Sequence, residues 1–243
     1  MACYNLRNIV SEEKGGRLMT RIIGRTIGRI GLLILFFIAY QLVSLLLINA
    51  TNTAAKAPLV SSEFLLYTTI AGSLLLVGFM LLYRRQLRGE NPRQFGFTTL
   101  TFKRVALFIA YFAAMLGVQL LWEQLIIHHI LPSPQNQTMI EQAVNKLPLW
   151  NNFYDVFAAP IFEEFIFRGF FFNYFFNRKT KRTAILGILV SGLIFGFLHT
   201  LDFSVSTLLY SSLGWILAGA YLYFKDLRYP IGLHVLNNFL SII

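Results

Sequence analysis

Long uncharged apolar runs indicate whether a chain folds in water or in a lipid bilayer, and this chain contains several of them. One run begins near Ile30 and continues without a charged residue to Ala55, and about 20 apolar residues in a helix cross the hydrocarbon core of a bilayer. The residues are 56% hydrophobic and 13% charged, whereas roughly 25% are charged in soluble domains. We therefore expect an integral membrane protein that keeps its first apolar run as a span, because that run is too long for a cleaved signal peptide.

Seven segments are apolar enough to be membrane helices. Lipid leaves no partner for free backbone N–H and C=O groups, and the runs are too continuously apolar for barrel strands. The expected fold is all-α, a polytopic integral membrane bundle of about seven transmembrane helices. The predicted spans are Ile30–Ala50, Phe64–Tyr83, Val105–Ile127, Asn152–Phe176, Ala184–Leu201, Val205–Phe224 and the short Pro230–Ile243.

The pattern divides the chain into three parts. Residues 1–29 form a basic N-terminal segment, residues 30–150 hold three membrane helices and an external loop, and residues 151–243 hold a core of four membrane helices. Within the external loop, a short surface helix is expected near Met139–Lys146.

The basic residues indicate the orientation of the chain. The formal net charge is +10, but the cations fall in short clusters between apolar runs, so nucleic acid is not an expected partner. The loops on one side of the predicted bundle hold only Lys56 and Lys146, and the remaining loop cations lie on the other side. Because cytoplasmic loops carry the excess of Lys and Arg, we expect a multi-pass protein of the cell membrane with a cytoplasmic N-terminus.

Ionisable residues occur inside the fourth predicted span. Each charged residue at a helix centre costs about 2.5 to 3.5 kcal/mol on insertion scales. Three of them in one span, Glu163, Glu164 and Arg168, are therefore expected only where a function offsets that cost. Glu164 and Arg168 are spaced i, i+4 and are expected to form an ion pair, which leaves the Glu163 carboxylate free. The phenylalanine-rich run Phe165–Phe176 is expected to face lipid.

Two later spans carry further polar side chains, each in a pair with the same i, i+4 spacing. The fifth span offers Phe195 and His199, and the seventh offers His234 and Asn238. Taken alone, His199, His234 or Asn238 could be a hydrogen-bonding partner in helix packing. Their joint occurrence with a free carboxylate favours a hydrolytic site, which needs an acid or base and stabilisers of developing charge.

These motifs resemble those of the CAAX prenyl endopeptidase and bacteriocin-processing proteins, the CPBP or Abi-domain intramembrane proteases. The pattern E-E-x-x-x-R matches Glu163 to Arg168, F-x-x-x-H matches Phe195 to His199, and H-x-x-x-N matches His234 to Asn238. The resemblance covers roughly the last third of the chain and implies hydrolysis of a peptide bond within a membrane cavity.

The resemblance implies two alternative mechanisms. In a glutamate-protease mechanism, Glu163 and His199 activate a water molecule while His234 and Asn238 hold the oxyanion. In a metalloprotease mechanism, zinc is held by Glu163, His199 and His234. We favour the metal-free mechanism, which requires no cofactor, because the Asn238 amide suits an oxyanion contact better than a zinc ligand. Glu164, Arg168 and Phe195 are then supporting residues.

A difficulty arises from the depth of the two histidines. A rise of about 1.5 Å per residue puts His199 about 25 Å from Arg182, and His234 about 8 Å from Tyr229, so straight full-length spans would hold the imidazoles apart. We therefore expect the serine-rich stretch Asp202–Ser212 to be broken, re-entrant or tilted.

Other functions remain open at this stage. The main hypothesis is an intramembrane endopeptidase whose partners are the lipid bilayer and a peptide or a membrane-proximal protein segment. One alternative is a non-catalytic bacteriocin-immunity or peptide-binding membrane protein. Another is a small proton-linked transporter in which Glu163 and the histidines relay protons.

The charge asymmetry predicts the sidedness of two loops. Reporters fused at Pro132 and at Lys179 should lie on opposite sides of the membrane, with Lys179 in the cytoplasm, because basic loops are retained there. Paired alkaline phosphatase and fluorescent-protein fusions measure this. Identical sidedness of the two positions would contradict the predicted topology.

Overall fold

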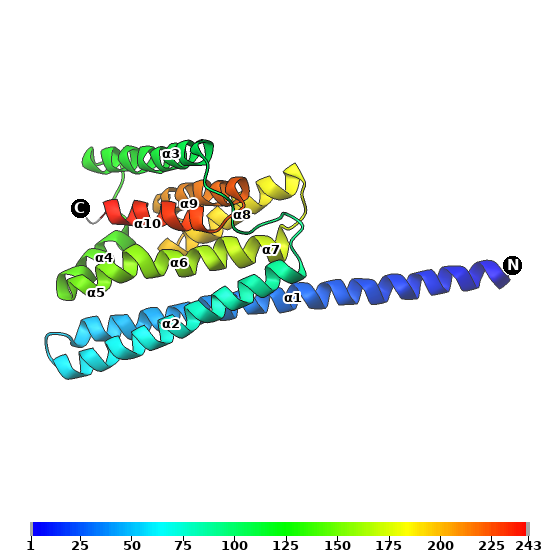
Figure 1. Ribbon diagram of the computed structural model, residues 1–243, viewed down its shortest axis with the longest axis horizontal. Coiled ribbons are helices and arrows are strands. Elements are labelled where there is room, and N and C mark those ends of the chain that lie inside the picture. Colours follow the sequence, from blue (N-terminus) through cyan, green and yellow to red (C-terminus); the bar gives the residue numbers. More distant parts are fainter. Residues whose placement is uncertain (1, 242–243) are drawn as a thin grey trace.

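The computed structural model describes residues 2–241, with side chains from Ile23 onward, and within that range it is helical and contains no strand. The order of elements follows the chain in Figure 1. They are α1 (Ala2–Thr53), α2 (Pro58–Gly89), α3 (Phe102–Ile127), α4 (Gln135–Lys146), α5 (Pro148–Phe153), the π-helical η1 (Tyr154–Ala158), α6 (Ala159–Glu164), the π-helical η2 (Phe165–Phe170), α7 (Phe171–Phe175), α8 (Lys181–Thr200), α9 (Val205–Phe224) and α10 (Arg228–Leu240). The expected all-α fold is confirmed.

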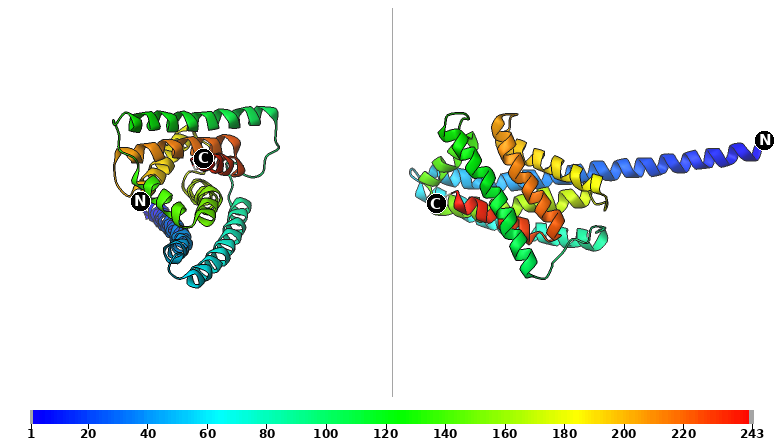
Figure 2. Two further views of the ribbon diagram at one scale, coloured as in Figure 1. Left: turned by 90° about the vertical axis from the view of Figure 1, so that its left-hand side faces the viewer. Right: turned by 90° about the horizontal axis from the view of Figure 1, so that it is seen from above.

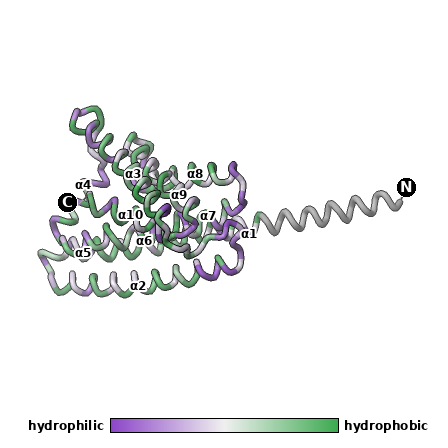
Figure 3. Tube along the Cα trace, turned by 45° about the horizontal axis from the view of Figure 1, so that its top comes forward, coloured by the Kyte–Doolittle hydropathy of each residue, from purple (hydrophilic) through white to green (hydrophobic). Residues whose placement is uncertain are grey.

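The helices are arranged in three tiers. α1 and α2 form one face, α3 forms the opposite face, and α6, α8, α9 and α10 lie between them (Figures 1 and 2). Hydrophilic residues gather at the end of the bundle where α2 and α7 terminate, whereas the helix bodies are mostly hydrophobic (Figure 3). This distribution is the one expected of a polytopic membrane bundle.

Five of the described helices are long and apolar enough to cross a membrane. They are Ile23–Thr53, Pro58–Gly89, Phe102–Ile127, Lys181–Thr200 and Val205–Phe224. They correspond to the predicted spans one, two, three, five and six.

The fourth and seventh predicted spans are helical but are not among these five. Residues 148–175 are helical throughout but are divided by two π-helical segments. α10 has 13 residues, too short to cross the hydrocarbon core alone. Residues 242–243 of the predicted seventh span lie outside the described residues.

Two further expectations concern the N-terminal part and the external loop. α1 continues through the expected boundary at residue 29; the side chains of residues 1–22 lie outside the described part of the chain. The expected surface helix is confirmed as α4, which begins earlier than predicted, at Gln135.

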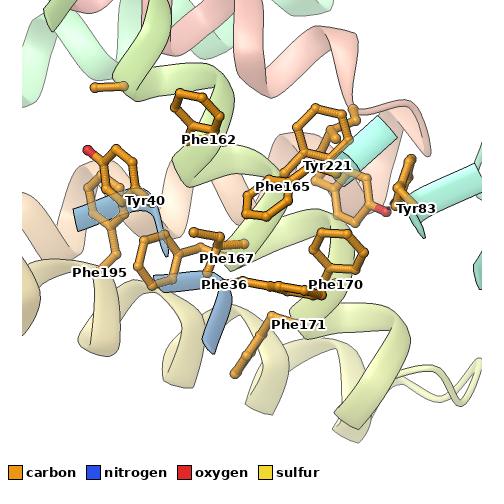
Figure 4. Close-up of a cluster of buried hydrophobic side chains, with 14 of the residues drawn as sticks. Phe36, Tyr40, Tyr83, Phe162, Phe165, Phe167, Phe170, Phe171, Phe195 and Tyr221 are labelled. Carbon is orange, nitrogen blue, oxygen red and sulfur yellow. Dashed lines mark hydrogen bonds between the residues drawn. The ribbon is translucent and has the colours of Figure 1, made fainter. Parts of the chain in front are cut away.

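The prediction that the phenylalanine-rich run faces lipid is wrong. Phe170 and Phe172 are 0% exposed, and Phe165, Phe167 and Phe171 are at most 7% exposed. They form an aromatic core with residues of α1 and α2 (Figure 4). The reason is that the segment carrying three charged side chains must itself be enclosed by protein. Its apolar residues therefore pack against the surrounding helices.

The stretch Asp202–Ser212 was expected to be broken, re-entrant or tilted, and a break beyond Ser204 is excluded. α9 begins at Val205 and runs without interruption to Phe224. The chain turns between α8 and α9 at Leu201, which adopts a left-handed conformation with φ 56°. α9 runs obliquely to α1 and α2 (Figure 2, right). His199 and His234 thus come to lie near each other although α9 is unbroken, and α9 is oblique.

Glycines allow α8 and α9 to pack closely. A Cβ on Gly196 would lie 2.5 Å from the Thr207 carbonyl oxygen, and one on Gly214 would lie 2.9 Å from the Gly192 Cα. Small residues at such contacts let membrane helices approach at the backbone. The hairpin therefore fixes the end of α8 that carries His199.

Gly196→Ala should destabilise the fold. Its methyl group would overlap backbone atoms of α9, and overpacking of this kind costs about 1 to 3 kcal/mol, so the unfolding temperature in detergent should fall. Gly78→Ala is the matched control, since a Cβ added at Gly78 would meet no described atom of a neighbouring element within 4 Å. Equal unfolding temperatures for the two variants would contradict the close packing of α8 on α9.

Candidate functional site

The segment that carries the two glutamates is a helix distorted on both sides. α6 holds Glu163 and Glu164 between η1 and η2, and π-helical turns often accompany functional sites. Pro160 explains the first distortion, because its ring lacks an N–H and clashes with the carbonyl of Val156 in a regular α-helix. The helix widens there instead of breaking.

Glu164 and Arg168 form a completely buried ion pair. Arg168 Nη1 donates to Glu164 Oε1 at 2.8 Å, and both side chains are 0% exposed. Arg168 Nη2 also donates to the Gly214 carbonyl of α9 at 3.0 Å. The predicted i, i+4 pair is confirmed, and it also joins α6 and η2 to α9.

Glu163 uses its two carboxylate oxygens differently. Oε1 accepts a hydrogen bond from the Tyr40 hydroxyl of α1 at 2.8 Å. Oε2 lies 3.8 Å from His199 Nε2 and 3.9 Å from His234 Nε2. One oxygen is therefore anchored to α1, and the other faces two imidazoles supplied by α8 and α10.

The hydrogen bonds of the two Nδ1 atoms determine which imidazole atoms face Glu163. His199 Nδ1 lies 2.8 Å from the Phe195 carbonyl oxygen, and His234 Nδ1 lies 3.0 Å from Glu164 Oε1. Because both of these oxygens accept, each Nδ1 is the donor and carries hydrogen. Both Nε2 atoms are thus directed at the Glu163 carboxylate. His234 contacts both glutamates, a bridge that the helical spacing of Glu163 and Glu164 did not predict.

Asn238 lies one helical turn beyond His234 and is anchored to η1. Its Nδ2 donates to the Asp155 carbonyl oxygen at 2.8 Å. A regular helical partner for that carbonyl is missing, since the Ala159 N–H donates to Tyr154 instead and Pro160 has no N–H. The distortion caused by the proline thereby supplies an acceptor that holds α10 against η1.

Aromatic rings form one wall of the site. The Phe195 ring lies 4.2 Å from the His199 ring, 5.7 Å from the His234 ring and 4.7 Å from the Arg168 guanidinium carbon. Tyr210 of α9 stacks on His199 with a centroid distance of 4.9 Å. The Phe195 ring thus packs against both imidazoles.

A cavity of about 910 Å³ opens onto these residues. Glu163, His199, His234 and Asn238 all line it, together with residues of α1, α3 and α4. Its polar lining from the N-terminal half includes Gln41, Gln119, Glu123 and Gln137. The volume lies in the range of ligand-binding pockets, so the cavity is large enough for a peptide segment.

Two contributions to the site, from α1 and α9, were not predicted from the sequence. Tyr40 contacts Glu163, and Tyr210 stacks on His199, yet neither residue was singled out. Tyr40 and Ser44 show the same i, i+4 spacing as the polar pairs that were recognised. That pattern was the available signal for Tyr40; tyrosine in a membrane helix is otherwise unremarkable.

The donor chemistry of the site suits zinc, but its spacing does not. One carboxylate and two imidazoles are an acceptable ligand set, and a neutral imidazole with its hydrogen on Nδ1 presents a lone pair on Nε2. Among the described residues, however, no group of three His, Cys, Asp or Glu side chains is close enough to hold a metal ion. We therefore derive no step through a metal.

The C-terminal segment matches known proteins. Residues 145–240 match the family model described as type II CAAX prenyl endopeptidase Rce1-like. The chain is similar to the membrane-embedded CAAX protease MroQ of Staphylococcus aureus (strain USA300), with 35% identity over 109 residues, which cover 44% of this chain and 42% of that protein. No solved structure gives a significant match. The resemblance predicted from the three motifs is confirmed for this segment.

Arg168→Met should strongly destabilise the protein. It leaves the Glu164 carboxylate buried without its cation, a change that costs about 3 to 5 kcal/mol. The unfolding temperature in detergent should fall, and Glu164→Gln in the same chain should recover part of the loss because the unpaired charge is then removed.

Arg25→Met is the control for this prediction. Arg25 is 62% exposed, and its partner Glu90 also pairs with Arg29, so its loss should cost no more than about 1 kcal/mol. Equal effects of the two arginine substitutions would contradict a stabilising role for the buried pair.

Proposed function

We propose that this protein is an intramembrane endopeptidase that hydrolyses a peptide bond in a peptide or in a membrane-proximal protein segment. The observation that carries the proposal is the position of Glu163 Oε2, within 3.9 Å of an Nε2 atom from each of two other helices, at the wall of a large cavity. The family match over residues 145–240 supports it.

The arrangement suits the activation of one water molecule. The separations around Glu163 Oε2 are too long for direct hydrogen bonds. The gap of 3.8 Å to His199 Nε2 allows a water about 2.8 Å from both the carboxylate and this nitrogen. Glu163 and His199 then remove a proton as the water oxygen attacks the scissile carbonyl carbon. The same proton passes to the amide nitrogen as the carbon–nitrogen bond breaks, and an acid and an amine are released.

His234 and Asn238 are placed to stabilise the oxyanion formed by that attack. With a proton also on Nε2, His234 donates toward the cavity while its Nδ1–H remains on Glu164. Asn238 uses one N–H for the Asp155 carbonyl and has a second to offer. Donors fixed in this way before the reaction stabilise developing charge most effectively.

The proposed mechanism needs no metal. The alternative is a zinc ion held by Glu163, His199 and His234, which would polarise the carbonyl and acidify a water, but the spacing of these described residues does not suit it. Activity in the presence of a chelator separates the two mechanisms.

The proposed setting is the cell membrane, with the N-terminus in the cytoplasm. The basic clusters between spans support this orientation. The substrate then reaches the cavity within or beside the bilayer, which excludes bulk water and strengthens the charge interactions of the site.

Glu163→Gln should abolish cleavage. The amide cannot accept the proton, so the rate should fall at least about 100-fold, as is usual for loss of a general base. The measurement uses purified protein in proteoliposomes with a library of internally quenched decapeptides, read by fluorescence and mass spectrometry. Glu63→Gln is the matched control, since Glu63 is an exposed glutamate of α2 that does not line the cavity, and it should retain activity.

Two further outcomes of this assay bear on the proposal. Activity that survives EDTA supports the metal-free mechanism, and activity that EDTA removes and zinc restores contradicts it. A wild-type protein that binds decapeptides without cutting any of them indicates a peptide-binding or immunity function and overturns the proposed hydrolysis.

A further inference from the structure

Tyr40 connects the first helix to the candidate site. Its hydroxyl donates to Glu163 Oε1 at 2.8 Å, and its side chain is 6% exposed. It lies at one edge of the aromatic cluster, beside Phe162, with a ring centroid distance of 5.6 Å (Figure 4). The ring packing restricts the side chain, so the hydroxyl is held in a fixed position relative to the carboxylate.

A second contact fixes the register of α1 against the same segment. The Ser44 hydroxyl lies 2.5 Å from the Tyr154 hydroxyl of η1. Tyr40 and Ser44 are one turn apart on α1, so together they contact both ends of the stretch from η1 to Glu163. α1 therefore cannot slide by a turn without losing both contacts.

The hydrogen bond from Tyr40 gives the two oxygens of the Glu163 carboxylate different partners. A free carboxylate can rotate and present either oxygen to the imidazoles. With Oε1 bound to the phenol, only Oε2 faces His199 and His234. Catalytic geometry of this kind loses rate when a group moves by about 1 Å, so the anchoring hydroxyl influences the reaction without touching the substrate.

We propose that Tyr40 is a positioning residue for Glu163, so that α1, which lies outside the segment matched by the family model, completes the proteolytic site. This inference rests on the proposed function. It assigns to the N-terminal helix a part in the reaction beyond anchoring the protein in the membrane.

The experiment compares Tyr40→Phe with the wild type on the library decapeptide that the wild type cleaves fastest. Loss of a hydrogen bond to a charged group should lower kcat about tenfold or more. KM should stay within about twofold, because the hydroxyl does not contact the peptide. The same proteoliposomes are used to measure unfolding temperature.

Tyr83→Phe is the matched control. Tyr83 is also a buried tyrosine, at 8% exposed, and its hydroxyl pairs with that of Tyr221 at 2.9 Å, away from Glu163. The two variants each lose one buried hydroxyl and should show similar shifts in unfolding temperature. Only Tyr40→Phe should lose kcat.

The outcomes separate this inference from the proposed function. If the wild type cuts decapeptides, Glu163→Gln does not, and Tyr40→Phe keeps its full kcat, only the role of Tyr40 is overturned. Equal kcat losses in Tyr40→Phe and Tyr83→Phe, or a Tyr40→Phe protein that no longer folds, assign the hydroxyl to stability and also overturn it. A wild type that cuts no decapeptide overturns the proposed function itself.

Discussion

The structure depends on the burial of a charged pair inside a bundle that faces lipid. Glu164 and Arg168 are both fully buried and 2.8 Å apart, and further hydrogen bonds to such a pair offset part of the cost of removing its charges from water. Glu164 Oε2 and Arg168 Nε have no hydrogen-bond partner among the described residues, but the other atoms of the pair do. Gly214 of α9 and His234 of α10 supply two of those partners. The segment that carries the pair is consequently the centre of the bundle, and its phenylalanines form the core.

The same constraint brings three helices to one point. His234 reaches Glu164 through Nδ1 and Glu163 through Nε2, so pairing of the buried carboxylate also aims the imidazole at the cavity. Close glycine contacts hold α8 beside α9 and place His199 at the same carboxylate. Stability and site geometry are therefore joined, since the contacts that satisfy the buried charges are also those that orient the candidate reactive groups.

The N-terminal half contributes more than membrane anchoring. Its helices α1, α3 and α4 line the cavity, and Tyr40 contacts Glu163 directly. α1 and α3 lie outside the segment matched by the family model, so their contributions are known from the structure alone. Cavity lining from the N-terminal half offers a physical basis on which proteins with the same three motifs can differ in the peptides they accept.

The sequence alone determined the fold class, the membrane setting and the identity of the polar pairs. Run length and composition decide between lipid and water as solvent, and i, i+4 spacing decides which side chains share a helix face. Glu164 with Arg168 and Phe195 with His199 were predictable for this reason.

Only the tertiary structure decided which apolar faces meet protein, where α9 begins, and that Tyr40 touches Glu163. Residues facing lipid and residues facing another helix are equally apolar, so hydropathy does not distinguish them. Phe165–Phe176 was misassigned on this account. Contacts between distant helices depend on crossing geometry, which is set by small residues and buried charges acting together across the whole bundle.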